Sequence, residues 1–196
     1  MSKAKDTKEK LWGNANPAPY MQATSRGLTK KIVKQISASK HEPNWMLQHR
    51  LDSLELFKNM PMPNWGPDLS KLDLDKITYF AQAHDQQATD WKDVPKDIKN
   101  TFDKLGIPQA EQKALAGVGA QYESTVIYHN LKQQWQDQGV IFEDMDVALQ
   151  KYPELMSEYF MKAVPSHLHK FTALHGAVWS GGTFLYVTKG VNIDLP

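Results

Sequence analysis

The chain of 196 residues contains no cysteine. Its own residues therefore offer no disulfide, no thiolate zinc site, no cysteine nucleophile and no cysteine-ligated cluster. Its apolar runs are much shorter than a membrane-spanning helix requires. The basic opening segment, MSKAKDTKEK, is not followed by the apolar region of a signal peptide. Together these absences predict a cytoplasmic protein.

An excess of charge of one sign is also lacking, and so are the common catalytic motifs. Lys and Arg number 23 against 22 Asp and Glu, so the net charge of +1 favours neither nucleic acid nor an acidic membrane. The sequence contains no G-x-S-x-G, H-E-x-x-H or Walker motif, and we therefore predict no enzymatic activity. The six tryptophans are scattered, which favours core or interface packing over a platform for nucleic-acid bases. A hydrophobic content of 41% still supports a folded core.

The first part of the chain predicts a mobile arm followed by two helices. Residues 1–27 show no apolar periodicity, which is typical of an arm. Thr29 is placed to cap a short helix. The apolar face of that helix would be Ile32, Val33 and Ile36. A second helix is expected to begin with Pro43 in its first turn and to end before Pro61 and Pro63. Its apolar face would be Leu47, Leu51, Leu54 and Phe57.

The middle of the chain predicts an ordered loop and further helices. Residues 60–75 contain three prolines among several apolar side chains, which favours an ordered loop. Residues 77–80 are compatible with either a short strand or a helical turn, and residues 140–142 with a short strand. Further helices are expected between Asp93 and Gly106, from Pro108 to Ala116, from Val126 to Gln138, and from Asp144 or Asp146 to about Lys162 with an interruption at Pro153.

The segment GVGAQYE, Gly117 to Glu123, invites comparison with a nucleotide-binding loop. A phosphate-binding fingerprint requires a third glycine and a preceding strand. The residues before Gly117, AEQKALA, are helical in character, so we favour a helix-breaking turn. Glu123 and His129 are six residues apart, which places them on different sides of a helix and makes them a poor acid–base pair.

The strongest candidate metal ligands are three histidines near the end of the chain. His167 and His169 flank a single residue, and His175 follows them. Because residues two apart in a strand point the same way, these imidazoles would be able to share an ion there. No nearby carboxylate completes a ligand set, and Lys170 lies beside the pair. A polar loop that approaches the strands is the simpler interpretation.

Strand-like alternation is clear only in the last twenty residues, AVWSGGTFLYVTKGVNIDLP. Val191, Ile193 and Leu195 alternate with polar residues, and residues 189–190 are placed to form a turn between two short runs. No βαβ alternation precedes this segment, so a doubly wound parallel sheet is not expected.

Several longer motifs resemble the N-terminal portion of the SufB family, the scaffold subunits of the Suf iron–sulfur cluster assembly system. They are EPNWMLQHRLDSLELFKNMPMPNWG (residues 42–66), LAGVGAQYESTVIYHN (residues 115–130) and the C-terminal AVWSGGTFLYVTKGVNIDLP. DVPKDIKNTFDKLGIPQAE and GVIFEDMDVALQKYPELMSEYF fit between them in the expected order. The resemblance extends from about Gly27 to Pro196. The paralogous subunit SufD is not expected to carry the GVGAQYE block in this form.

The resemblance implies a fold. Family members continue into a right-handed parallel β-helix, in which one coil buries its apolar face only against the next. We therefore expect a mobile arm (residues 1–27), a mainly α-helical N-terminal domain (residues 28–163), and the first strands of a truncated, incomplete right-handed parallel β-helix (residues 164–196). The chain would then be an N-terminal fragment of a SufB-type protein.

The resemblance also implies a function, as the scaffold subunit of the SufBCD complex. Its partners would be the SufC ATPase, the SufD subunit and a sulfur-donor system, and a nascent Fe–S cluster would be assembled on it. The family's cluster-assembly cysteine and its SufC-docking segment have no counterpart in this sequence. We therefore assign no catalytic, cofactor-binding or metal residue and no cofactor to this chain. The alternatives are a helical protein-interaction module without scaffold chemistry and a histidine-dependent metalloenzyme.

Overall fold

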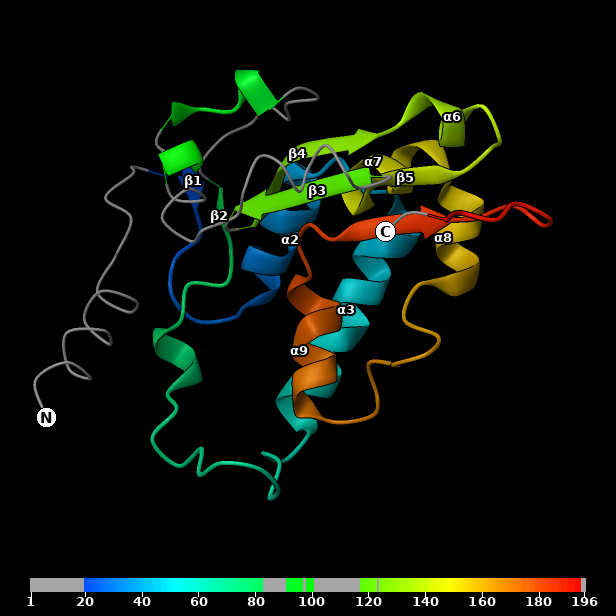
Figure 1. The fold of residues 1–196 in the computed structure, drawn as a ribbon. Helices are drawn as coiled ribbons and strands as arrows, with labels where there is room; N and C mark the ends of the chain where they lie inside the picture. Colours follow the sequence, from blue (N-terminus) through cyan, green and yellow to red (C-terminus); the bar gives the residue numbers. More distant parts are fainter. Residues whose placement is uncertain (1–19, 83–90, 97, 101–116, 123, 195–196) are drawn as a thin grey trace, which may run out of the picture.

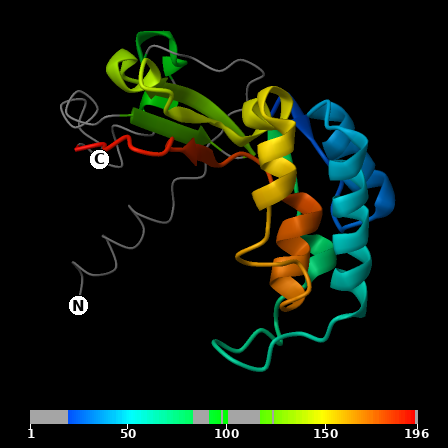
Figure 2. The same cartoon turned by 90° about the vertical axis from the view of Figure 1, so that its right-hand side faces the viewer.

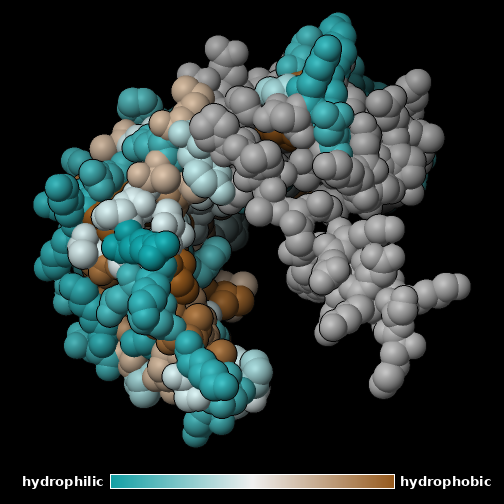
Figure 3. All heavy atoms as spheres, turned by 90° about the vertical axis from the view of Figure 1, so that its left-hand side faces the viewer, coloured by the Kyte–Doolittle hydropathy of each residue, from teal (hydrophilic) through white to brown (hydrophobic). Residues whose placement is uncertain are grey.

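The computed structural model describes residues 20–82, 91–96, 98–100, 117–122 and 124–194. The strands gather at one end of this part of the molecule. Helices α3 (Asn44–Asn59) and α9 (Lys170–Val178) run side by side away from them (Figures 1 and 2). From the side shown in Figure 3, hydrophilic residues cover most of the helical face, while apolar residues gather along its hollowed inner edge. Among the described residues, no helix has the length and apolar character needed to cross a membrane.

The first described segment is extended and paired. β1 (Gln22–Ala23) pairs antiparallel with β2 (Ala81–Gln82), and an isolated bridge joins Arg26 to Thr78. The segment 77–80, whose conformation the sequence left open, is therefore extended. The short 3₁₀ helix η1 (Leu74–Lys76) precedes it. Residues 1–19 of the predicted arm lie outside the described residues, whereas its last residues run beside β2.

Helix α2 (Lys30–Ser39) confirms the prediction for its residues. The Thr29 side chain accepts a hydrogen bond from the backbone N–H of Ile32, which caps the helix. The predicted apolar face is buried. It packs on one side against helix α3 and on the other against Phe80.

Helix α3 (Asn44–Asn59) ends where predicted, but its buried face differs from the prediction. Pro43 is its N-cap residue rather than a member of its first turn. The buried residues are Met46, Arg50, Ser53, Leu54 and Phe57. The predicted Leu47 and Leu51 are only half-buried. The face is rotated because α3 packs closely against a later helix, which brings polar Arg50 and Ser53 into the core.

That later helix is α9 (Lys170–Val178), in a segment where the sequence predicted a polar loop. It lies alongside α3 and shares a core of Val33, Leu54, Phe57, Ala173 and Ala177. The close approach depends on Gly176. A Cβ atom on this glycine would lie 2.5 Å from Ser53 Oγ, so a larger residue would push the two helices apart.

The β3–β4 hairpin corrects two predictions. Residues expected to form a helix-breaking turn make strand β3 (Gly117–Tyr122), and residues expected to begin a helix make strand β4 (Thr125–Leu131). The strands pair antiparallel, with Gly117 opposite Leu131. Valine, isoleucine, threonine and tyrosine dominate the start of β4, and these residue types favour a strand over a helix. Only the short helix α6 (Gln133–Gln136) remains of the predicted helix.

The last elements combine a second ladder with two short helices. β5 (Ile141–Asp144) confirms the predicted strand, and Asp144 then caps α7 (Met145–Lys151). The predicted interruption lies at Tyr152, and helix α8 (Pro153–Tyr159) begins with Pro153 as its first residue. β6 (Thr183–Tyr186) pairs antiparallel with β5, followed by the predicted turn at residues 189–190. Residues 191–194 form no strand, although Val191 and Ile193 pack near Trp135 and Val140.

The described residues therefore form a mixed α/β architecture with several helices and a few short strands. The described residues form three two-stranded ladders, each antiparallel, and no closed sheet. They show no parallel β-helix. The 3₁₀ helix η2 (Trp91–Asp93) and helical backbone at residues 98–100 agree with the start of the helix predicted after Asp93. Its remainder, and the helix predicted from Pro108 to Ala116, lie outside the described residues.

Candidate functional site

Helix α9 explains why two of the candidate histidines do not act together as metal ligands. His169 is its N-cap residue, and His169 Nδ1 accepts hydrogen bonds from the N–H groups of Phe171 (3.1 Å) and Thr172 (3.4 Å). Thr172 Oγ1 in turn accepts a hydrogen bond from the N–H of His169, which completes a capping box. One ring nitrogen of His169 is therefore committed to the helix end. The strand geometry that the metal-site alternative requires is therefore absent at His167 and His169.

The other two histidines are in different surroundings. His167 is exposed in the loop before α9, and His175 is exposed on the helix itself, with its ring partly covered by neighbouring atoms. Burial lowers the pKa of His175, with a smaller contribution from the positive charge of Arg50. Among the described residues, no group of three or more His, Cys, Asp and Glu side chains is arranged to hold a metal ion. The three candidate histidines therefore form no shared site among the described residues.

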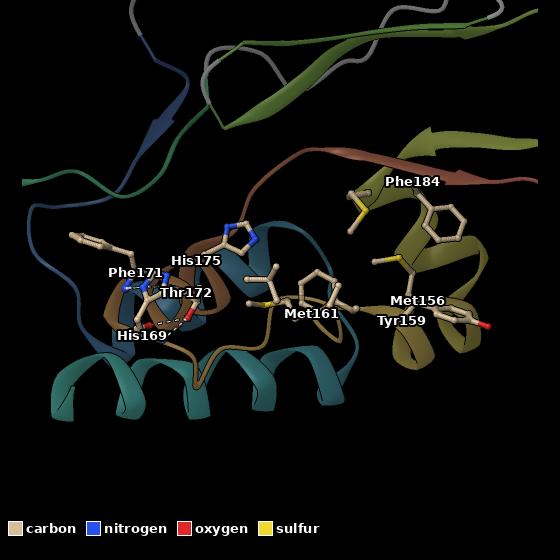
Figure 4. Close-up of a pocket in the computed structure, with 12 residues that line it drawn as sticks. Met156, Tyr159, Met161, His169, Phe171, Thr172, His175 and Phe184 are labelled. Carbon is tan, nitrogen blue, oxygen red and sulfur yellow. Dashed lines mark hydrogen bonds between the residues drawn. The ribbon is translucent and has the colours of Figure 1, made fainter. Parts of the chain in front are cut away.

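An apolar pocket opens between α8, α9 and β6. It has a volume of about 610 Å³. Three methionines and four aromatic residues contribute to its lining: Met145, Met156, Met161, Tyr159, Phe160, Phe171 and Phe184. Figure 4 shows Phe184, Met156 and Tyr159 on one side, His169, Phe171, Thr172 and His175 on the other, and Met161 between them. We call this pocket the α8–α9 groove.

The rim of the α8–α9 groove leaves apolar side chains in contact with solvent. Tyr159 is 60% exposed and Val164 is 52% exposed. Leu185 and Tyr186 on the neighbouring strand β6 are also exposed. Methionine-rich apolar surfaces are adaptable and common at sites that bind protein partners. The groove is thus suited to contact with another protein surface rather than to chemistry on a polar substrate.

A second hollow, of about 670 Å³, lies on the other side of Met161. It brings together His49 from α3, Met161, and Ser166 from the loop before α9. His49 Nε2 lies 3.3 Å from Met161 Sδ. Nothing in the local sequence around His49 marked it as a candidate site residue, because its neighbours come from segments more than one hundred positions away.

A buried ion pair fixes the helical walls of these hollows. The Arg50 side chain is completely buried and forms a two-point salt bridge with Glu42. It also donates hydrogen bonds to the carbonyl groups of Ala177 (3.2 Å) and Trp179 (3.0 Å), at the end of α9. Its guanidinium lies 4.7 Å from the centre of the Trp179 ring. Arg50 is therefore a structural anchor between α3 and the segment that leads into β6.

A second buried charge cluster joins α2 to α7. Lys40 forms a salt bridge with Asp146, and its ammonium lies 5.8 Å from both the Phe80 and the Trp179 ring centres. Burial raises the pKa of Asp144 to about 6, and repulsion from Asp146 adds to the effect. Because Asp144 Oδ1 also accepts a hydrogen bond from the N–H of Asp146, this carboxyl caps α7. The Lys40–Asp146 salt bridge and the Asp144 cap thus hold α7 in place, while the ionised form of buried Asp144 is unfavourable.

The remaining predicted candidates take structural positions. GVGAQY is a hairpin strand rather than a loop that opens a helix, so the nucleotide-binding interpretation is excluded for residues 117–122. Glu123 lies outside the described residues. The backbone of His129 belongs to β4, opposite Gly119.

Comparison with known proteins decides the family. The family model described as "SufBD protein N-terminal region" matches residues 31–196. The chain belongs to the SufBD family. A SufBD family iron–sulfur cluster assembly protein of Staphylococcus aureus (strain USA300) is 51% identical over 194 residues, which cover 99% of this chain and 42% of the relative. One from Staphylococcus saprophyticus is 54% identical over 173 residues, or 88% of this chain and 37% of that relative.

Both relatives are described as iron–sulfur cluster assembly proteins of the SufBD family. The matched region is described as N-terminal, and the chain spans about two fifths of the length of the S. aureus relative, at 42%. The family match confirms the coarse part of the predicted resemblance. The α8–α9 groove, the hollow beside His49 and the buried anchor at Arg50 are therefore features of a SufBD N-terminal region.

Proposed function

We propose that this chain supplies the N-terminal region of a SufB-type scaffold subunit, which works in the cytoplasm with SufC and SufD. Two observations support this proposal: the SufBD family match over residues 31–196, and the SufB-like GVGAQYE block at residues 117–123. ATP would be hydrolysed by SufC, and sulfur would come from a donor system. The iron–sulfur cluster is the cargo of this process rather than a resident cofactor of this region.

Within such a subunit, the role of this region is to bind a partner protein through the α8–α9 groove. The observation that carries this role is the groove itself, an apolar hollow of about 610 Å³ with exposed Tyr159 and Val164 at its rim. The chain contributes no thiolate to hold iron, because it has no cysteine. Its contribution is therefore a surface for assembly and not a catalytic group.

Co-expression with SufC and SufD tests the partner-binding role. The tagged chain should retain at least one of them through size-exclusion chromatography. Tyr159→Asp and Val164→Asp should weaken that retention, because each places a charge on the rim of an apolar interface. Lys34→Asp is the matched control, since Lys34 is exposed on α2, away from the groove. Retention of neither subunit, or equal retention by all variants, would contradict the proposal.

Incubation with iron and sulfide tests the proposal that cluster chemistry lies elsewhere. The chain alone, treated anaerobically and then desalted, should keep no visible chromophore and no acid-labile sulfide. A stable brown protein with stoichiometric iron and sulfide would show that residues of this region do hold a cluster. The same assay on a longer SufBD protein that contains this region separates the two alternatives. A scaffold should hold a cluster, whereas an interaction module without scaffold chemistry should hold none.

A further inference from the structure

Three donor atoms from distant parts of the chain meet in the wall between the two hollows. His49 Nε2 and Met161 Sδ are 3.3 Å apart. Ser166 Oγ lies 3.5 Å from each of them. The three atoms thus form a nearly equilateral triangle. Metal–ligand bonds of about 2.0–2.3 Å leave donor atoms on one ion about this far apart, with an angle of roughly 100° between them at the ion.

The backbone of Met161 gives a second, independent sign that this position is specialised. Its φ angle is +51°, in the left-handed region that residues other than glycine rarely adopt. Such a conformation costs free energy and persists only where the surroundings hold it. Here it follows α8 and places the thioether between the α8–α9 groove and the hollow that contains His49. Met161 is half-buried, so small solutes have access to it.

The charged residue next to His49 on α3 is Arg50. The Arg50 charge does not exclude a cation from the site, because its guanidinium is paired with Glu42. His175 also lines the groove that Met161 lines, which brings a second imidazole to the same region.

We propose that His49 and Met161 form a binding site for a soft monovalent cation, Cu(I), with Ser166 Oγ as a weaker third donor. Thioether sulfur and neutral imidazole suit Cu(I), whereas Zn(II) prefers thiolates, imidazoles and carboxylates. The described residues place no thiolate or carboxylate in the triangle. The proposed site does not rest on partner binding or on cluster assembly, although Met161 also lines the α8–α9 groove.

Anaerobic titration of the full chain with Cu(I), against a chromophoric Cu(I) chelator, tests the site. The chain should take up one Cu(I) ion, and X-ray absorption should show copper bonded to both sulfur and nitrogen. Met161→Leu and His49→Gln should each weaken the affinity by about tenfold or more, a loss that even outer-shell changes cause in metal sites. Met145→Leu is the matched control, because Met145 lines the α8–α9 groove but not the hollow that contains His49 and Ser166.

Two results would overturn the proposal. One is the absence of stoichiometric Cu(I) uptake, which would leave the triangle as an ordinary hydrogen-bonding contact in the core. The other is uptake that Met161→Leu leaves unchanged. If either substitution unfolds the chain, the absorption spectrum of the unaltered protein decides, since a copper ion without a sulfur neighbour would also exclude the site.

Discussion

The helical body and the strand end of this molecule are stabilised by different interactions. In the body, α2, α3 and α9 bury apolar faces around Arg50, which is 0% exposed and fully paired. At the strand end, β5 and β6 form a two-stranded ladder whose Leu185 is 57% exposed. Two-stranded ladders are marginal in water unless other elements pack on them. We infer that the helical body supplies most of the stability and that the strand end depends on its neighbours.

The largest effect is expected from breaking the anchor between the two regions. Arg50→Met should destabilise the chain by about 3–5 kcal/mol, because it leaves the Glu42 carboxylate buried without its partner. The carbonyl groups of Ala177 and Trp179 would also lose their donor. Urea unfolding, followed by circular dichroism, measures the change in the free energy of unfolding.

The matched control is the double variant Arg50→Met with Glu42→Gln. The double variant removes the unpaired negative charge of the buried Glu42 carboxylate, so it should recover a substantial part of the lost stability. A loss below about 1 kcal/mol in the single variant would mean that the ion pair contributes no more than a typical surface pair. The comparison between the two regions would then need another explanation.

A smaller effect, of opposite sign, is expected at the cluster that joins α2 to α7. The pKa of Asp144 is raised from 3.8 to about 6 in the folded chain, so ionisation of this carboxyl opposes folding. The penalty is absent below about pH 4, grows between pH 4 and 6, and is complete above pH 6. Asp144→Asn should therefore stabilise the chain by roughly 1–3 kcal/mol at pH 7.5. Asparagine also preserves the helix cap.

The measurement is the difference in the free energy of unfolding between Asp144→Asn and the unaltered chain as a function of pH. The advantage of the variant should disappear as pH falls through 6 towards 4. Glu143→Gln is the control, because Glu143 pairs with Lys151 near the surface and should change stability by only a few tenths of a kcal/mol. An advantage that is independent of pH would show that Asp144 is not the titrating group.

The smallest effect on stability is expected at the exposed strand. Leu185→Ser should change the free energy of unfolding by no more than about 0.5 kcal/mol, because the side chain is mostly in water already. The same change should reduce any concentration-dependent association in light scattering, since it removes an apolar group from β6. A loss comparable to that of Arg50→Met would show that the strand end is as tightly packed as the helical body.

The sequence predicted the parts of the fold that depend on local signals. Thr29 and the spacing of Ile32, Val33 and Ile36 sufficed for α2, because a cap and an apolar stripe are both local. The strand at β5 and the turn at residues 189–190 were found for the same reason. The rotated face of α3 was not predictable in this way. Arg50 and Ser53 are polar, and only their partners in distant segments make burial favourable.

The hairpin and the candidate site show the same limit. Residues 125–131 contain apolar residues at spacings that fit a helix or a strand, and pairing with β3 decides between them. His169 could be recognised as a cap only once α9 was known, although the threonine three residues later was an available signal. His49 and Met161 are 112 positions apart, so no sequence window contains both. The site is a product of tertiary packing.

The contact between Arg50 and the carbonyl groups of Ala177 and Trp179 also has a consequence for the order of folding. Ala177 and Trp179 lie 127 and 129 positions after Arg50 in the sequence. Bringing them into contact with Arg50 therefore closes a long loop and costs chain entropy. Contacts of this range slow folding, and they form late unless nearer contacts have already shortened the path. The direction in which the chain leaves α9 is set by this contact. Strand β6 should therefore find its register on β5 only after α3 and α9 have come together.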